Sequence, residues 1–131
     1  MNDVAANLFR ALDRELWVIT ARSGETAGGL ICTSLTQASI NDAKPRVILG
    51  LAVHHQTQRL VEESGTFIAH LLKRDQSEWV NRFGMQSGEE LDKFRDLDTI
   101  SSATGVPVLD TAEAWLDCRV EEAMSSGDRY W

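Results

Sequence analysis

Proline is scarce in this sequence and glycine is not enriched: of its 131 residues, nine are glycine and two are proline. This composition excludes collagen-like, low-complexity and disordered chains. Hydrophobic residues make up 43% of the chain and charged residues 25%, which is typical of a globular protein. We therefore expect a single domain over residues 1–131.

Basic residues are also in short supply. The chain has 13 Lys and Arg against 20 Asp and Glu, a net charge of -7, and such a chain repels the phosphates of nucleic acids. No apolar run approaches the roughly 20 residues that cross a bilayer, and Asp3 stands where a secretory leader would be basic. We expect a cytoplasmic protein that binds neither nucleic acid nor membrane.

Cysteine and histidine are too few and too dispersed for a metal centre. Cys32 and Cys118 lack C-x-x-C spacing, which argues against both a zinc site and a redox pair. We expect both to be small buried hydrophobes. His54 and His55 are adjacent in a predicted loop with no further ligand at metal-binding spacing, so no metal site is predicted.

Hydrophobic periodicity predicts a chain made mostly of strands. Apolar residues at spacings of three and four over residues 4–12 predict an N-terminal helix. The run at 47–53 is continuously apolar and should be buried on both faces, with a close approach at Gly50. Without a G-x-G-x-x-G after a strand, the pattern favours an antiparallel barrel over a nucleotide fold. The expected strands are 16–21, 30–40, 47–53, 66–72 and 114–121, with a hairpin turn over 22–29.

Short helices and one long loop are expected between these strands. A helix over 57–64 should end at Gly65, and a second helix is predicted over 75–83. Residues 85–106 show no strand period and form a candidate lid, because long loops in small domains are more often functional than idle. A further strand begins at 129–131, so we expect the sequence to be a shortened form of a longer protein.

Several segments together carry a family resemblance. Residues 16–21 (LWVITA), 28–39 (GGLICTSLTQAS) and 47–57 (VILGLAVHHQT) resemble the flavin reductase-like domain with an FMN-binding split barrel. Residues 104–109 (TGVPVL) and 115–118 (WLDC) follow in the family's order. The resemblance implies a mainly β fold, an antiparallel split β-barrel with short flanking helices, and a homodimer that builds the flavin pocket between its subunits.

The resemblance also implies which residues form the site. His55, Gln56 and Thr57 would hold the flavin phosphate at the start of a helix, where unpaired amides favour an anion. Lys93 and Phe94 would cover the flavin or meet the neighbouring subunit. The residues beside the isoalloxazine ring would be Thr33, Ser34, Thr36, Gln37, Ala38 and Ser39.

Each of these assignments has a structural alternative. The hydroxyl-rich segment is also what a strand edge satisfied by its own side chains would look like. The two histidines could be solvated loop residues. Lys93 and Phe94 could be a surface lysine beside a core phenylalanine.

The implied function is that of an oxidoreductase. Hydride would pass from NAD(P)H to FMN, or to FAD, and the reduced flavin could supply a partner oxygenase; the flavin carries the chemistry, so no catalytic side chain is predicted. Many relatives have a histidine after Gly-Asp where this chain has Arg129. Arginine cannot act as a neutral imidazole would, though it can pair with a pyrophosphate or carboxylate. The alternative function is a non-catalytic FMN-binding module or an empty structural barrel.

Overall fold

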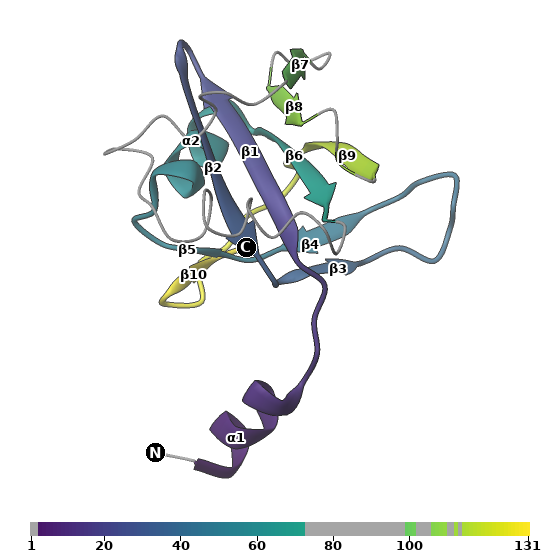
Figure 1. Ribbon diagram of the computed structural model, residues 1–131, viewed down its shortest axis with the longest axis vertical. Coiled ribbons are helices and arrows are strands. Elements are labelled where there is room, and N and C mark those ends of the chain that lie inside the picture. The colour runs from purple at the N-terminus through teal and green to yellow at the C-terminus, as the bar shows by residue number, and fades with distance from the viewer. Residues whose placement is uncertain (1–2, 73–98, 102–105, 110–111, 113) are drawn as a thin grey trace.

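The computed structural model describes residues 3–72, 99–101, 106–109, 112 and 114–131 (Figure 1). Strands outnumber helices among the described residues, which contain only two short helices. The elements in chain order are α1 (Asp3–Ala11), β1 (Trp17–Ser23), β2 (Thr26–Cys32), β3 (Leu35–Gln37), β4 (Val47–Leu49), β5 (Leu51–Ala52), α2 (Gln56–Ser64), β6 (Thr66–Leu71), β7 (Thr99–Ser101), β8 (Pro107–Leu109), β9 (Ala114–Arg119) and β10 (Arg129–Tyr130). In this described part, neither helix is long and apolar enough to cross a membrane.

The main sheet has the strand order β2-β1-β6-β9, and all its pairs are antiparallel. Three two-stranded antiparallel sheets accompany it: β3 with β4, β5 with β10, and β7 with β8. The mainly β, antiparallel fold class that the resemblance implies is therefore confirmed.

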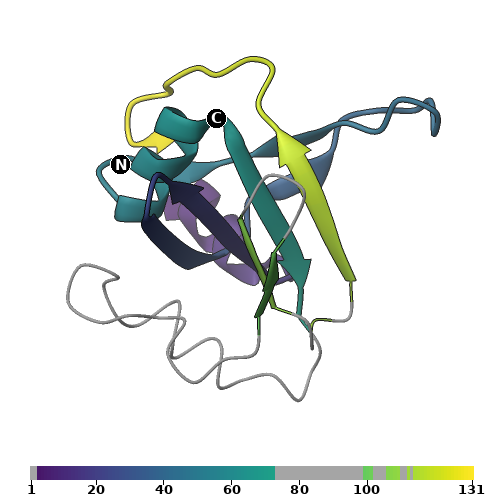
Figure 2. The ribbon, with the colours of Figure 1, turned by 90° about the horizontal axis from the view of Figure 1, so that it is seen from above.

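The two faces of the main sheet bury different cores, because side chains alternate along a strand. Ile19 and Phe67 lie on the face that packs against α2 and against the inner residues of β4 and β5. Val18 and Ile68 lie on the opposite face, which packs against β8. Figure 2, in which the molecule is seen from above, shows β7 and β8 beside β6. The candidate functional site lies on the α2 side of the main sheet.

The N-terminal helix is confirmed as α1, but it buries none of its residues. Its apolar side chains, among them Leu8 and Phe9, are exposed. Figure 1 shows α1 projecting away from the strands on an extended connection. The sequence pattern thus predicted this helix correctly, but it did not predict that the apolar side chains of the helix are exposed.

The expected strand at residues 30–40 is wrong in its bounds. β2 begins earlier, at Thr26, takes in Gly28 and Gly29 of the expected turn, and ends at Cys32. The reason is a local hydrogen bond: the Ser34 backbone amide donates to Cys32 Sγ at 3.2 Å, which turns the chain before β3. The hairpin turn itself is tighter than expected and contains Gly24 at a φ of 60°.

The expected strand at 47–53 is divided at Gly50. β4 pairs with β3, whereas β5 pairs with β10, so the run serves two sheets. It is also not buried on both faces, because Leu49 and Leu51 face the core while Ile48 is 46% exposed. The close approach at Gly50 is confirmed: a Cβ added there would lie 2.5 Å from the ring of Trp131.

The remaining expectations have mixed outcomes. The helix ending at Gly65 is confirmed as α2, whose Gly65 amide donates to the Val61 carbonyl at 2.8 Å. The strands at 66–72 and 129–131 are confirmed as β6 and β10, and β9 matches the last long strand. The expected helix at 75–83 lies outside the described residues, as does most of the expected lid over 85–106. Within that range Thr99–Ser101 is a strand paired with β8, which corrects the expectation of a strandless loop.

Candidate functional site

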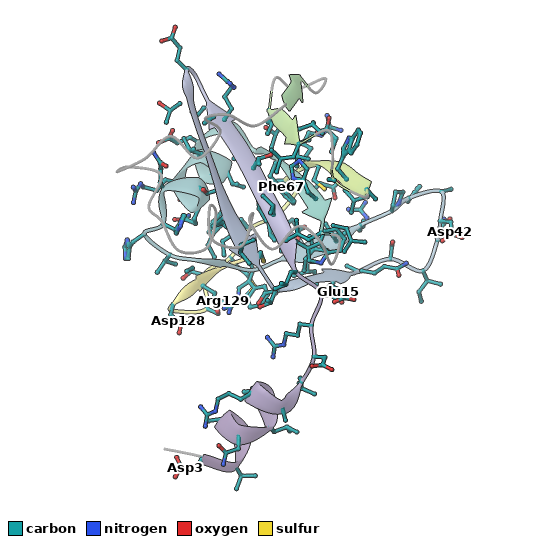
Figure 3. The ribbon with its side chains drawn as sticks, in the orientation of Figure 1. Asp3, Glu15, Asp42, Phe67, Asp128 and Arg129 are labelled. Carbon is teal, nitrogen blue, oxygen red and sulfur yellow. The ribbon has the colours of Figure 1, made fainter. Side chains whose placement is uncertain are left out.

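A compact polar cluster forms where the chain leaves β2 and enters β3. The Gly50 amide donates to the Ser34 carbonyl at 2.8 Å, which joins this turn to the β4–β5 junction. The Cys32 thiol is buried and donates to the Gly50 carbonyl at 3.5 Å. Arg129 completes the cluster from β10, because its Nη1 donates to the Ser34 hydroxyl and, at 3.5 Å, to the Gly50 carbonyl. Figure 3 labels Arg129 beside the end of β2.

Trp131 packs on the other side of this cluster. Its ring covers Gly50 so closely that no side chain fits there. The Arg129 guanidinium lies over the same ring, 5.8 Å from its centroid, and the indole N–H donates to Ser126 Oγ at 2.7 Å. The last residues of the chain are thereby fixed against the turn that carries Ser34.

The predicted ring-binding segment, residues 33–39, starts in this turn and continues along β3. Thr36 and Gln37 pair with β4, and the Ala38 amide donates to the Arg46 carbonyl at 2.9 Å. Ser39 Oγ accepts a hydrogen bond from the Arg46 amide at 3.0 Å, so this hydroxyl stabilises the connection between β3 and β4. Thr33 and Thr36 are exposed and, within the described residues, their hydroxyls form no hydrogen bond. The segment therefore offers free donors and acceptors on its exposed side.

The predicted phosphate-binding residues lie at the start of α2. His55 is the N-cap residue, and its Nδ1 accepts a hydrogen bond from the Thr57 amide at 3.1 Å. This contact satisfies one of the amide groups that a helix start leaves unpaired. His54, before it, adopts a φ of 66°, and its carbonyl accepts from Arg59 Nη1 at 2.7 Å. The turn into α2 is thus fixed by its own side chains.

Two buried oxygens in the first turn of α2 lack a hydrogen-bond partner among the described residues: Gln56 Oε1 and Thr57 Oγ1. Both face β2 at Gly28, where an added Cβ would lie 3.0 Å from Thr57 Oγ1 and 3.3 Å from Gln56 Oε1. Thr57 is fully buried. Because an unsatisfied buried oxygen is costly, these two atoms mark a position suited to a further polar group.

Strand β2 connects the two predicted groups of site residues. Gly28 lies against the start of α2, and Cys32, four positions later on the same face, contacts Ser34 and Gly50. At about 3.3 Å per residue, the two ends are about 13 Å apart along the strand. Lys93 and Phe94, the other predicted site residues, lie outside the described residues.

Burial raises the pKa of the Cys32 thiol, although the Ser34 amide and the charge of Arg129 oppose this shift. Burial likewise raises the pKa of Cys118 to about 11. Cys32 is buried, as predicted, whereas Cys118 is only half-buried, and both thiols are free. No group of three potential metal ligands is found among the described residues.

Sequence reasoning missed the contacts that assemble the site. It singled out Arg129 as a departure from the family pattern but gave it no partner, and it treated Cys32 as a plain hydrophobe. Gly50, in the middle of an apolar run, was the one signal that another group comes close. Trp131, 81 positions later, could not be paired with it from the sequence.

Comparison with known proteins identifies the family of this chain. A family described as "Flavin reductase like domain" matches residues 9–131. The chain belongs to this flavin reductase-like family.

Three relatives illustrate the family. Diflavin flavoprotein A 1 of Synechocystis is 26% identical over 99% of this chain, and reductase subunit HsaB of a flavin-dependent monooxygenase from Mycobacterium tuberculosis is 28% identical over 86% of it. The crystal structure of nitrilotriacetate monooxygenase component B from Mycobacterium thermoresistibile matches 99% of this chain and 72% of its own, with a TM-score of 0.84 and 25% identity. The chain spans only 23% of the diflavin protein and 58% of HsaB.

Proposed function

We propose that this flavin reductase-like domain binds FMN and reduces it with NAD(P)H. The observation that carries the proposal is the family match over residues 9–131, together with two polar groups placed near the two ends of β2. FMN has a flat polar ring at one end and a phosphate at the other, and these two ends correspond to the two polar groups. FAD carries the same ring and is the alternative cofactor.

The residues present fit such a ligand. Orphaned Gln56 Oε1 and Thr57 Oγ1 are the type of buried atoms that a bound polar group would satisfy. Near Ser34, the exposed Thr33 and Thr36 hydroxyls and the strand amides would hold the ring edge, while the first turn of α2 would hold the phosphate end. When bound, the flavin supplies the hydride chemistry.

An absorption experiment tests this proposal. The purified protein is titrated with FMN and then with FAD, and NADH or NADPH is added without oxygen. The proposal predicts a saturable flavin spectrum that one of the nucleotides bleaches. A protein that shifts neither flavin spectrum at saturating concentration does not have the proposed function.

A non-catalytic flavin-binding module is the second candidate. The observation that favours it is Arg129, which occupies the position of the histidine found in many relatives and is already engaged by Ser34 and Gly50. In that case the flavin spectrum would shift on binding, and neither nucleotide would bleach it.

We also propose that the domain acts as a homodimer in the cytoplasm and passes reduced flavin to an oxygenase. The dimer is supported by β9, an edge strand in the described sheet whose Trp115 and Leu116 are 42% and 43% exposed on opposite faces. HsaB, a reductase subunit of a flavin-dependent monooxygenase by its name, supports the oxygenase partner.

A further inference from the structure

Arg129 is held in place by contacts on three sides. Its guanidinium donates to the Ser34 hydroxyl and to the Gly50 carbonyl, and its Cζ lies over the ring of Trp131. Trp131 is itself fixed by Gly50 beneath it and by the hydrogen bond to Ser126. A guanidinium held this way presents its N–H groups in fixed directions.

This arrangement decides the role of the Ser34 hydroxyl. A serine hydroxyl has one proton to donate and two lone pairs that accept, whereas arginine carries donors only. Ser34 must therefore accept from Arg129, and its own proton stays available. Within the described part of the chain, that proton has no acceptor. The hydroxyl is thus left as a donor toward whatever lies beside it.

The oxidised isoalloxazine ring presents carbonyl oxygens and bare nitrogens at its polar edge, and these groups accept hydrogen bonds. We infer that Arg129 is a positioning residue: it fixes the Ser34 hydroxyl as a hydrogen-bond donor to the oxidised flavin ring. The inference rests on the proposed function, since it needs the ring to lie along residues 33–39.

The planar guanidinium of arginine is essential to this role. One Nη1 reaches acceptors on two different segments, Ser34 in the β2–β3 turn and Gly50 between β4 and β5. These segments are already joined by the Gly50 amide and the Ser34 carbonyl. Lysine could keep the charge, but its ammonium would not be stacked on Trp131 and directed at both acceptors.

The test compares FMN dissociation constants of Arg129→Gln, Arg129→Lys, Ser34→Ala and the double variant Ser34→Ala with Arg129→Gln. We expect each of Arg129→Gln and Ser34→Ala to weaken binding about tenfold. The double variant should bind no more weakly than the worse single variant, because both remove the same hydrogen bond to the ring. Arg129→Lys should fall between the wild type and Arg129→Gln.

Arg14→Gln is the matched control, because Arg14 is an exposed arginine outside β9 and its loss changes the net charge equally. Amide hydrogen exchange of residues 33–37 in the flavin-free proteins gives a second readout. It should accelerate in both Arg129 variants and stay at the wild-type rate in Arg14→Gln.

The outcomes separate this inference from the proposed function. Normal FMN binding by the wild type with unaltered affinity in Arg129→Gln, or losses that multiply in the double variant, overturns the inference alone. Unchanged amide exchange in the Arg129 variants also overturns it. A wild type that binds no flavin overturns the proposed function and the donor role together.

Discussion

The ring of Trp131 lies directly on the backbone of Gly50, so that a Cβ at residue 50 would stand 2.5 Å from Cζ3 of the indole. This contact joins the last residue of the chain to the junction between β4 and β5. It also supports the guanidinium of Arg129, which lies over the same ring. The contact therefore links the stability of the C-terminal hairpin to the geometry around Ser34.

Substitution Gly50→Ala should destabilise the protein, because the methyl group can only be placed by moving Trp131. We expect a loss of about 1–3 kcal/mol in the free energy of unfolding, measured by urea denaturation. In a Trp131→Leu background the same substitution should cost much less, since the ring is gone. Equal costs in the two backgrounds would show that Trp131 does not constrain residue 50.

His70 should make the protein acid-sensitive. It is fully buried; its Nδ1 lies 2.9 Å from the Val18 carbonyl and its Nε2 accepts from the Leu109 amide at 3.0 Å, so the neutral ring with a proton on Nδ1 satisfies both. Burial lowers the pKa of His70 from 6.5 to about 4, whereas the unfolded chain keeps the ordinary value. Between these values the unfolded state binds more protons, so stability falls as the pH falls from 6.5 toward 4.

The loss in the free energy of unfolding amounts to about 3 kcal/mol between pH 6.5 and pH 4. His70→Gln can still donate and accept but does not titrate, so it isolates the effect from the carboxylates. Urea unfolding at pH 7 and pH 4.5 should show a larger acid loss in the wild type than in the variant. An identical acid loss in both proteins would mean that His70 is not the titrating group.

Thr57→Val should separate stability from ligand binding. The variant removes a buried hydroxyl that has no partner among the described residues, so the flavin-free protein should be as stable as the wild type or more stable. FMN affinity should fall if that hydroxyl serves the ligand. Thr66→Val is the control: its hydroxyl donates to Ser64 Oγ at 3.4 Å, so it should lose about 1 kcal/mol and keep its FMN affinity. A destabilised Thr57→Val would show that the hydroxyl has a protein partner.

Leu116→Asp should convert the proposed homodimer into a monomer. Leu116 is half exposed on the edge strand β9, and a carboxylate there would have to be desolvated at an interface. Light scattering coupled to size exclusion gives the mass directly. Met124→Asp is the control, because Met124 is 63% exposed and lies outside β9. A wild-type protein that runs as a monomer would refute the dimer.

Elements set by local sequence could be predicted well. The helix α2 has its apolar spacing and the left-handed Gly65 within one segment, and β6 follows directly. The break between β2 and β3 could not be predicted, because it depends on the Cys32 thiol and on Gly50, 18 positions away. The division of the apolar run at Gly50 has the same origin, since two different partner strands take its halves.

The candidate site is likewise predictable where it depends on local segments and not where it depends on contacts between residues far apart in the chain. Family resemblance identified the segments 33–39 and 55–57, and the structure places them near the two ends of β2. The resemblance could not give the engagement of Ser34 by Arg129, because the two residues are 95 positions apart and the arginine is this chain's departure from the family pattern. Nor could it show that the Thr57 hydroxyl turns inward toward Gly28.

The most direct measurement is an FMN titration of the wild type beside Ser34→Ala and Thr57→Val, followed by absorbance. The two residues stand at opposite ends of the proposed site: Thr57 lies beside Gly28, and Ser34 contacts Cys32, about 13 Å from Gly28 along β2. If the flavin spans these two groups, the wild type binds FMN stoichiometrically and both variants bind it more weakly, while Arg14→Gln matches the wild type. Wild-type binding that neither variant weakens would place the flavin elsewhere and contradict the account.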